Sequence, residues 1–346
     1  MKKRLLAVAA FMLSLNGYAA NDAAWMRYCA ISPDGQQIAF SYKGDIYTVG
    51  VNGGRANQIT TNPAHDTRPI WSPNGQQIAF ASDRLGGMDI YIVDKEGGIP
   101  TRITTHSGNE TPLAFKDNGH ILFQANILPA ADDMQFASAQ FPQVYEVSTS
   151  GGRPIMFSSM PMEDISISAD GKTLLYHDKK GYEDNWRKHH TSSITRDVWM
   201  CNLDGERSYK KLSTFNGEDR TPVWANADTY YYLSEQNGSF NVFKANLNEG
   251  NPIQVTKHDK HPVRFLTRAN NGTLCYGYNG GIYTLKEGEQ PQKVNINVVT
   301  DKIDRDIIRQ IKNSGATQIA LSAEGKEVAF ILRGDVYVTS TEYKTT

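Results

Sequence analysis

Seven cationic or titratable side chains stand in loop-like segments of this sequence and have the chemistry to recognise a negatively charged ligand. An arginine guanidinium forms paired, directional hydrogen bonds to a carboxylate. A histidine has an unperturbed pKa of roughly 6.5, so its charge varies near neutrality. We therefore predict a surface that binds peptides through their carboxylates or their extended backbone. The predicted peptide-binding residues are Arg68, Arg84, Arg187, Lys188, His189, His190 and Arg220.

Other kinds of site find little support in the sequence. The G-x-S-x-G, H-E-x-x-H and G-x-G-x-x-G patterns of common hydrolases, metalloproteases and dinucleotide enzymes are missing. His189 and His190 are adjacent, so in an extended loop their side chains diverge instead of converging on a metal. We assign no catalytic residue, no metal site and no cofactor to this chain.

An internal repeat shows which elements must position these side chains. Residues 31–60 read ISPDGQQIAFSYKGDIYTVGVNGGRANQIT, and residues 71–104 read WSPNGQQIAFASDRLGGMDIYIVDKEGGIPTRIT. Weaker copies follow at intervals of about 40 to 56 residues, a period typical of propeller blades. Each copy contains four strand-like runs, with Asp-Gly or Asn-Gly turns where the backbone needs a positive φ.

The repeat predicts an all-β fold, a six-bladed β-propeller of four-stranded blades followed by the start of a second propeller. The expected divisions are a signal peptide at 1–20, the six-bladed propeller at 25–299, a linker at 300–315, and an incomplete first blade of a second propeller at 316–346. Loops after the second and fourth strands of each blade then share one face of the disc. The predicted peptide-binding residues belong to that face, and function on a propeller sits mostly in such loops.

The N-terminal segment indicates the cellular compartment, and the net charge limits the kinds of partner. Lys2, Lys3 and Arg4 precede an apolar run from Leu5 to Leu15, as in a bacterial secretory signal, so we expect a periplasmic or secreted protein. We expect no membrane span after signal removal, because the run is far shorter than the roughly 20 residues that a spanning helix needs. The formal net charge of −1 makes nucleic acid a poor partner.

The three cysteines, Cys29, Cys201 and Cys275, allow at most one disulfide. Each lies in or beside a strand-like run, which favours the role of a small buried apolar residue.

Several segments together resemble the N-terminal propeller of bacterial tricorn-like proteases. The most specific is GYEDNWRKHHTSSITRDVW at 181–199, and GEDRTPVW at 217–224 and GTLCYGYNGGIY at 272–283 also resemble that family. In that family a six-bladed propeller precedes a seven-bladed one, a PDZ-like domain and a serine-protease core. The resemblance implies that the propellers filter and channel peptides, and that the catalytic residues lie beyond this sequence.

The leading functional hypothesis is therefore a non-catalytic, substrate-gating propeller of a secreted tricorn-like serine peptidase. Its expected partners are peptides and the downstream propeller, PDZ-like and protease domains, with a homo-oligomer possible. One alternative is a free-standing periplasmic propeller, similar to the TolB class, that mediates protein–protein interaction. Another is a propeller hydrolase or lyase with its site in the face loops.

Overall fold

Every regular element that the structure describes is a β-strand. The computed structural model describes residues 25–127, 141–182, 192–248, 251–299, 312 and 314–342. Within these residues there is no helix, and hence none that could cross a membrane. The expected signal peptide and most of the expected linker lie outside the described residues, so the domain divisions stay predictions.

Six antiparallel sheets form the blades of a propeller, and each blade follows chain order from its inner to its outer strand. The first three blades comprise β1 (Arg27–Ile31), β2 (Gln37–Tyr42), β3 (Asp45–Gly50) and β4 (Gly54–Gln58); β5 (Asp66–Trp71), β6 (Gln77–Leu85), β7 (Gly87–Asp94) and β8 (Thr101–Arg102); and β9 (Thr111–Asp117), β10 (His120–Ala125), β11 (Gln143–Ser148) and β12 (Ile155–Ser158).

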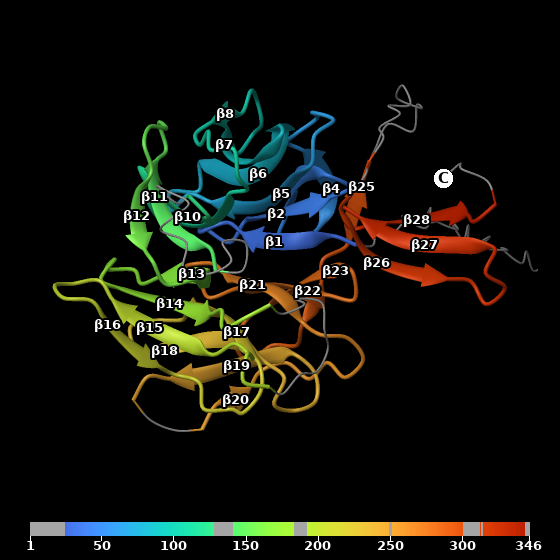
Figure 1. The fold of residues 1–346 in the computed structure, drawn as a ribbon. Coiled ribbons are helices and arrows are strands. Elements are labelled where there is room, and N and C mark those ends of the chain that lie inside the picture. The colour runs from blue at the N-terminus through green and yellow to red at the C-terminus, as the bar shows by residue number, and fades with distance from the viewer. Residues whose placement is uncertain are drawn as a thin grey trace, which may run out of the picture.

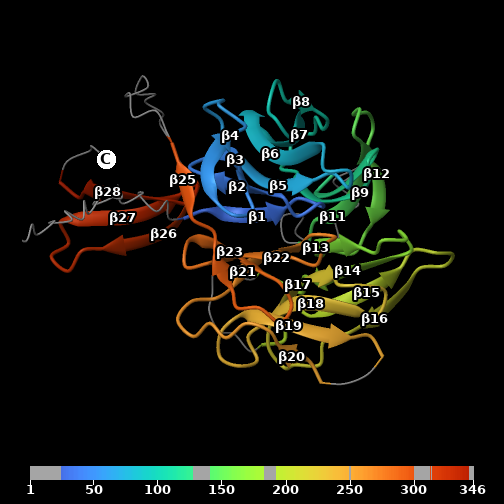
Figure 2. The ribbon, with the colours of Figure 1, turned by 180° about the vertical axis from the view of Figure 1, so that it is seen from behind.

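Blades four to six repeat the same order. They comprise β13 (Met162–Ile167), β14 (Thr173–Asp178), β15 (Val198–Asn202) and β16 (Ser208–Lys211); β17 (Asp219–Trp224), β18 (Thr229–Ser234), β19 (Asn241–Asn246) and β20 (Ile253–Gln254); and β21 (Arg264–Arg268), β22 (Leu274–Tyr278), β23 (Gly281–Leu285) and β24 (Gln292–Lys293). Figures 1 and 2 show β1, β13, β17 and β21 near the middle of the molecule and β8, β12, β16 and β20 at its rim.

The repeated turn after each inner strand has a specific hydrogen-bonding basis. The Ser32 hydroxyl donates to Asp34 Oδ1 at 2.6 Å and accepts from the Gln37 amide at 2.9 Å. Gly35 adopts φ +72° in the same turn, a conformation that costs glycine little. Equivalent bonds join Ser72 to Asn74 and Ser168 to Asp170. The Ser-Pro-Asp-Gly pattern is therefore a structural signature of the blade and not a binding motif.

The apolar core is divided among the seams between blades. Each of the six buried clusters in the described residues combines side chains of two neighbouring blades, and all six seams are filled in this way. No blade buries both of its faces alone, which explains why the fold needs the whole ring.

The ring is closed by a strand that departs from the simple four-strand repeat. Strand β25 (Ile296–Val298) follows blade six but pairs in parallel with β4, so the first blade becomes a five-stranded sheet. Gly54 N–H donates to Asn295 O at 2.9 Å where the chain crosses between the two blades. Although β25 follows the fourth strand of blade six in the sequence, its partner is the outer strand of the first blade.

A seventh sheet stands beside the ring. Strands β26 (Ala316–Leu321), β27 (Glu327–Leu332) and β28 (Asp335–Ser340) form a three-stranded antiparallel sheet, the start of a second propeller. It extends outward next to β25 in both views (Figures 1 and 2). Arg333 forms an ion pair with Asp83, and Arg27 donates to Gly334 O at 3.4 Å.

Candidate functional site

In five of the six inner strands, a register shift coincides with a residue of positive φ. In β1, β5, β13, β17 and β21 the register shifts so that two residues oppose one residue of the second strand, as in a β-bulge. One residue of each bulge has a positive φ between 49° and 59°, and we call these five residues the axial ring. They are Tyr28, Arg68, Asp164, Thr221 and Phe265.

The backbone conformation of the axial ring is energetically unfavourable, and five blades adopt it. A left-handed backbone conformation is unfavourable for residues other than glycine, and such strain persists only where the surroundings impose it. The register places a buried aromatic residue opposite each bulge: Phe40, Phe80, Tyr176, Tyr232 and Tyr276. Bulges re-aim side chains, and here they do so on the strands that surround the axis.

Contacts between neighbouring blades join the axial ring into an aromatic part and a polar part. The Arg68 guanidinium lies 4.6 Å from the centre of the Tyr28 ring. Tyr28 in turn packs against Phe265 with ring centroids 4.8 Å apart. On the other side of the ring, Thr221 Oγ1 donates to Asp164 Oδ2 at 2.6 Å. The axial ring therefore brings aromatic faces, a cation and a carboxylate together on neighbouring inner strands.

Arg68 remains cationic in this setting. Burial alone would lower its pKa, but Tyr28 and the negative charges of Asp164 and Glu163 raise the pKa above its ordinary value. A half-buried guanidinium on an inner strand can form paired hydrogen bonds with a carboxylate ligand.

A buried ionic network supports the polar part of the ring. Arg196, only 2% exposed, donates from Nη1 to Glu218 Oε1 at 2.7 Å and from Nε to Glu163 Oε2 at 3.4 Å. His177 Nδ1 accepts from the Thr221 amide at 3.3 Å, so Nε2 carries the proton and donates to Glu163 at 3.2 Å. Burial would raise the pKa of Glu163, but the His177 hydrogen bond and the nearby cations hold the pKa well below its ordinary value.

The predicted peptide-binding residues have different surroundings. Arg68 belongs to the axial ring. Arg84 Nη2 pairs with Asp66 Oδ2 at 2.7 Å and covers the Tyr91 ring at 5.0 Å, so it is held within blade two. Arg220 is buried, lies 3.4 Å from Glu218 Oε1 and stacks 4.1 Å from the Phe240 ring centre. Arg187, Lys188, His189 and His190 lie outside the described residues.

Sequence reasoning missed Tyr28, Asp164, Thr221 and Phe265. Each of them, like Arg68, precedes by four places the residue that opens the following turn, namely Ser32, Ser168, Ala225, Ala269 and, for Arg68, Ser72. A comparison of equivalent repeat positions could have identified them. Their significance lies in the bulge, which residue types alone do not indicate.

Two buried carboxyls near the beginnings of inner strands have unusual proton affinity. Burial raises the pKa of Glu110 to about 7, and burial likewise raises the pKa of Asp219 to about 7. Asp66, at the start of β5, instead pairs with Arg84. In the described part of the chain, no group of three or more His, Cys, Asp or Glu side chains is placed to hold a metal ion.

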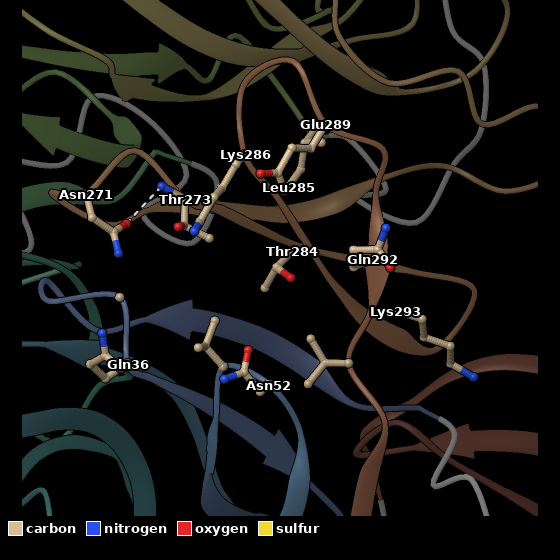
Figure 3. A pocket seen from close by; sticks show the side chains of 13 residues that line it. Gln36, Asn52, Asn271, Thr273, Thr284, Leu285, Lys286, Glu289, Gln292 and Lys293 are labelled. Atoms are coloured by element: carbon tan, nitrogen blue, oxygen red, sulfur yellow. Dashed lines mark hydrogen bonds between the residues drawn. The ribbon is translucent and has the colours of Figure 1, made fainter.

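A cavity of about 510 Å³ lies at the seam of blades six and one (Figure 3). Its lining includes Gln36 and Asn52 from blade one and Asn271, Thr284 and Lys286 from blade six. It is formed by the turns after first and third strands, on the face opposite the loops that follow second and fourth strands. It is thus separate from the surface that the sequence analysis predicts for peptides.

The chain matches the model of the tricorn protease N-terminal β-propeller domain over residues 23–291. It is 21% identical over 275 residues to tricorn protease homolog 1 of Streptomyces coelicolor, covering 79% of this chain and 25% of that protein. A crystal structure of the tricorn protease superposes with a TM-score of 0.68 at 20% identity, covering 92% of this chain and 30% of that one.

The fold also resembles TolB from Acinetobacter baumannii, with a TM-score of 0.55 at 16% identity over 79% of this chain and 66% of that one. The chain spans about a quarter of the length of the curated relatives that it matches. Because the family model covers most of the sequence, this chain belongs to the tricorn protease N-terminal β-propeller family.

Proposed function

We propose that this chain is the non-catalytic propeller portion of a secreted tricorn-like serine peptidase, and that it screens peptides along its axis. The axial ring is the observation that carries the proposal. Five strained residues from five blades bring a cation, a carboxylate and aromatic faces together, an arrangement suited to the ends and backbone of peptides.

The loop that contains Arg187, Lys188, His189 and His190 belongs to the same proposal. In the sequence it follows β14, whose residue His177 belongs to the buried network behind Asp164. In the proposal, this loop presents cations to anionic peptide ends before they reach the axial ring. Protonation of the two histidines strengthens this binding as the pH falls.

The remaining partners follow from the family. Its members named above are several times longer than this chain, so we propose a downstream propeller, a PDZ-like domain and a serine-protease core as partners in the same protein. A periplasmic or secreted location and a homo-oligomer are part of the same proposal.

Peptide binding tests the gate directly. Acidic peptides with free C-termini are titrated against the wild-type chain, Arg68→Ala and Arg187→Ala/Lys188→Ala, with Arg153→Ala as the control at an exposed arginine. Loss of a charge-assisted pair with a desolvated carboxylate costs about 1 to 3 kcal/mol, roughly 5- to 150-fold in affinity. Amidated peptides should show a smaller difference between wild type and Arg68→Ala.

Two results would contradict the gate. One is a wild-type chain that binds none of the peptides. The other is equal affinity for wild type, Arg68→Ala and the double variant, which would mean that these cations serve only the fold.

The likeness to TolB favours a second candidate, a free-standing propeller that mediates protein–protein interaction. The coding sequence that follows the Thr346 codon distinguishes the two. An in-frame PDZ-like and protease region supports the gate, and an immediate stop codon supports the second candidate.

A further inference from the structure

Two of the three cysteines meet where the ring closes. Cys29 lies in β1 of the first blade and Cys275 in β22 of the sixth. They are 2% and 0% exposed, and both belong to the apolar cluster that fills this seam. The sequence analysis allowed at most one disulfide and favoured the role of small buried apolar residues, because each cysteine lies in or beside a strand-like run.

Two hydrogen bonds, one at Cys29 and one two residues beyond it, hold β1 against β21 of blade six. Cys29 Sγ lies 3.6 Å from Phe265 O, and Ile31 N–H donates to Thr267 Oγ1 at 3.1 Å. Thr267 is the antiparallel partner of Cys275. The strand that carries Cys29 is therefore held against the strand pair that carries Cys275.

Both thiols are free in the structure, and they lie within hydrogen-bonding contact of each other in the same apolar cluster. Burial raises the pKa of the Cys275 thiol well above its ordinary value, and the hydrogen-bonding contact with the Cys29 thiol raises it further. Cys201 has a different environment, since it packs in the seam of blades three and four with Sγ 3.5 Å from Asn202 O. The geometry thus selects one pair out of the three possible ones.

We propose that Cys29 and Cys275 form a disulfide that covalently joins the first and sixth blades. The oxidant is a disulfide of the glutathione or disulfide-oxidoreductase class. One cysteine thiolate attacks it, forming a mixed disulfide and releasing one thiolate of the oxidant. The second cysteine thiolate then attacks the protein sulfur of the mixed disulfide and releases the other. The protein loses two protons and two electrons, and the oxidant is reduced to two thiols.

Burial determines when this reaction occurs. The thiolate is the reactive form, and two buried thiols with little thiolate character are nearly inert. Oxidation therefore takes place while the seam is open, before blade six packs against blade one. The expected export of the chain brings it to a compartment where disulfides form.

The disulfide would confine the unfolded chain strongly. The loop that it closes contains nearly the whole ring, and cross-links that close long loops restrict the unfolded ensemble most. A ring with this disulfide resists opening at the seam that joins its first and last blades.

Thiol counting after refolding tests the proposal. The chain is refolded from denaturant in oxidised and reduced glutathione or in dithiothreitol, and is then labelled with a maleimide in denaturant. We expect one labelled cysteine, Cys201, after oxidative refolding and three after reducing refolding. Peptide mapping should find Cys29 linked to Cys275, and the urea midpoint of the oxidised chain should be higher.

Single variants separate this pair from the others. Cys201→Ala should keep the disulfide and show no labelled cysteine, whereas Cys29→Ala and Cys275→Ala should each show two. Three labelled cysteines in oxidatively refolded wild type would overturn the proposal, as would a disulfide that includes Cys201. The wild-type measurement decides the question even if a variant fails to fold.

Discussion

At the scale of single residues, the axial ring concentrates strain where the inner strands meet. A lone positive φ at a residue such as Thr221 is unusual, because the branched side chain crowds the backbone. Because five such residues occupy equivalent positions in five blades, the strained conformation is a regular feature of the blade. It is offset by the packing of the aromatic residue opposite each bulge and, behind Asp164 and Thr221, by the buried ionic network.

Glu110 and Asp219 should make stability depend on pH in an uncommon direction. Their folded pKa of about 7 exceeds the ordinary values of 4.5 and 3.8, so between about pH 4 and pH 7 the folded chain holds protons that the unfolded chain has released. Their contribution is complete below the unfolded pKa and is lost as the pH rises through 7. Each carboxyl changes the free energy of unfolding by at most about 1.4 kcal/mol per pH unit.

The measurement is urea unfolding at pH 5.5 and pH 8 for wild type, Glu110→Gln and Asp219→Asn. Burial lowers the pKa of His65 and His258, and these groups act in the opposite direction, so the comparison is between variant and wild type. Between pH 5.5 and pH 8, the free energy of unfolding should fall by about 1 to 2 kcal/mol less in each variant than in wild type. Exposed Glu206→Gln serves as the control, and variants with the same pH dependence as wild type would contradict the assignment.

Individual site residues were only partly predictable. Arg68 could be named because its guanidinium suits carboxylates wherever it lies. Asp164 and Thr221 become notable only through the bulges that bring them together across a seam. Arg84 and Arg220 were predicted as binding residues because of their charge. The folded chain instead pairs them with Asp66 and Glu218, and these pairs depend on packing that the sequence does not show.

At the scale of elements, the crossing from blade six to β25 depends on one glycine. Gly53 adopts φ +85°, and a Cβ atom there would lie 2.4 Å from Asn295 O. Gly205 adopts a similar φ of +75° in a turn where an added Cβ meets nothing within 4 Å. The two positions therefore separate the cost of the backbone conformation from the cost of the close contact.

We expect Gly205→Ala to cost about 1 to 2 kcal/mol of stability, the usual penalty for a left-handed residue with a side chain. Gly53→Ala should cost about 2 to 5 kcal/mol, because a clash with the backbone of the crossing adds to that penalty. Urea unfolding of both variants measures the difference. Equal losses would show that β25 contributes little to closing the ring.

The elements divide clearly into those the sequence predicts and those it does not. The turn at Ser32 and its repeats are local, because every hydrogen bond joins residues a few places apart, so the blades could be predicted from their turns. The pairing of β25 with β4 joins opposite ends of the ring in a parallel register. No local pattern specifies such a partner, so the repeat alone could not predict this pairing.

At the scale of the whole molecule, the seventh sheet is the least buried part that the structure describes. Ile319, Leu321, Val336 and Val338 are more than half exposed, and none of the sheet's residues joins the six seam clusters. We expect faster amide hydrogen exchange in β26–β28 than in β2 and β22, since local stability follows buried apolar contact. Equal protection of the two sets of strands would contradict this expectation.

The parallel pairing of β25 with β4 also determines how long the ring stays open while the chain is being synthesised. Gly54 of β4 pairs with Ile296 of β25 although 242 residues separate them. At roughly 5 to 20 residues per second, a nascent chain needs about 10 to 50 seconds to deliver the second partner after the first. During that interval the outer edge of β4 has unpaired backbone groups that can hydrogen-bond to a strand of another chain. Newly made chains should therefore depend on chaperones for far longer than any single blade needs to fold.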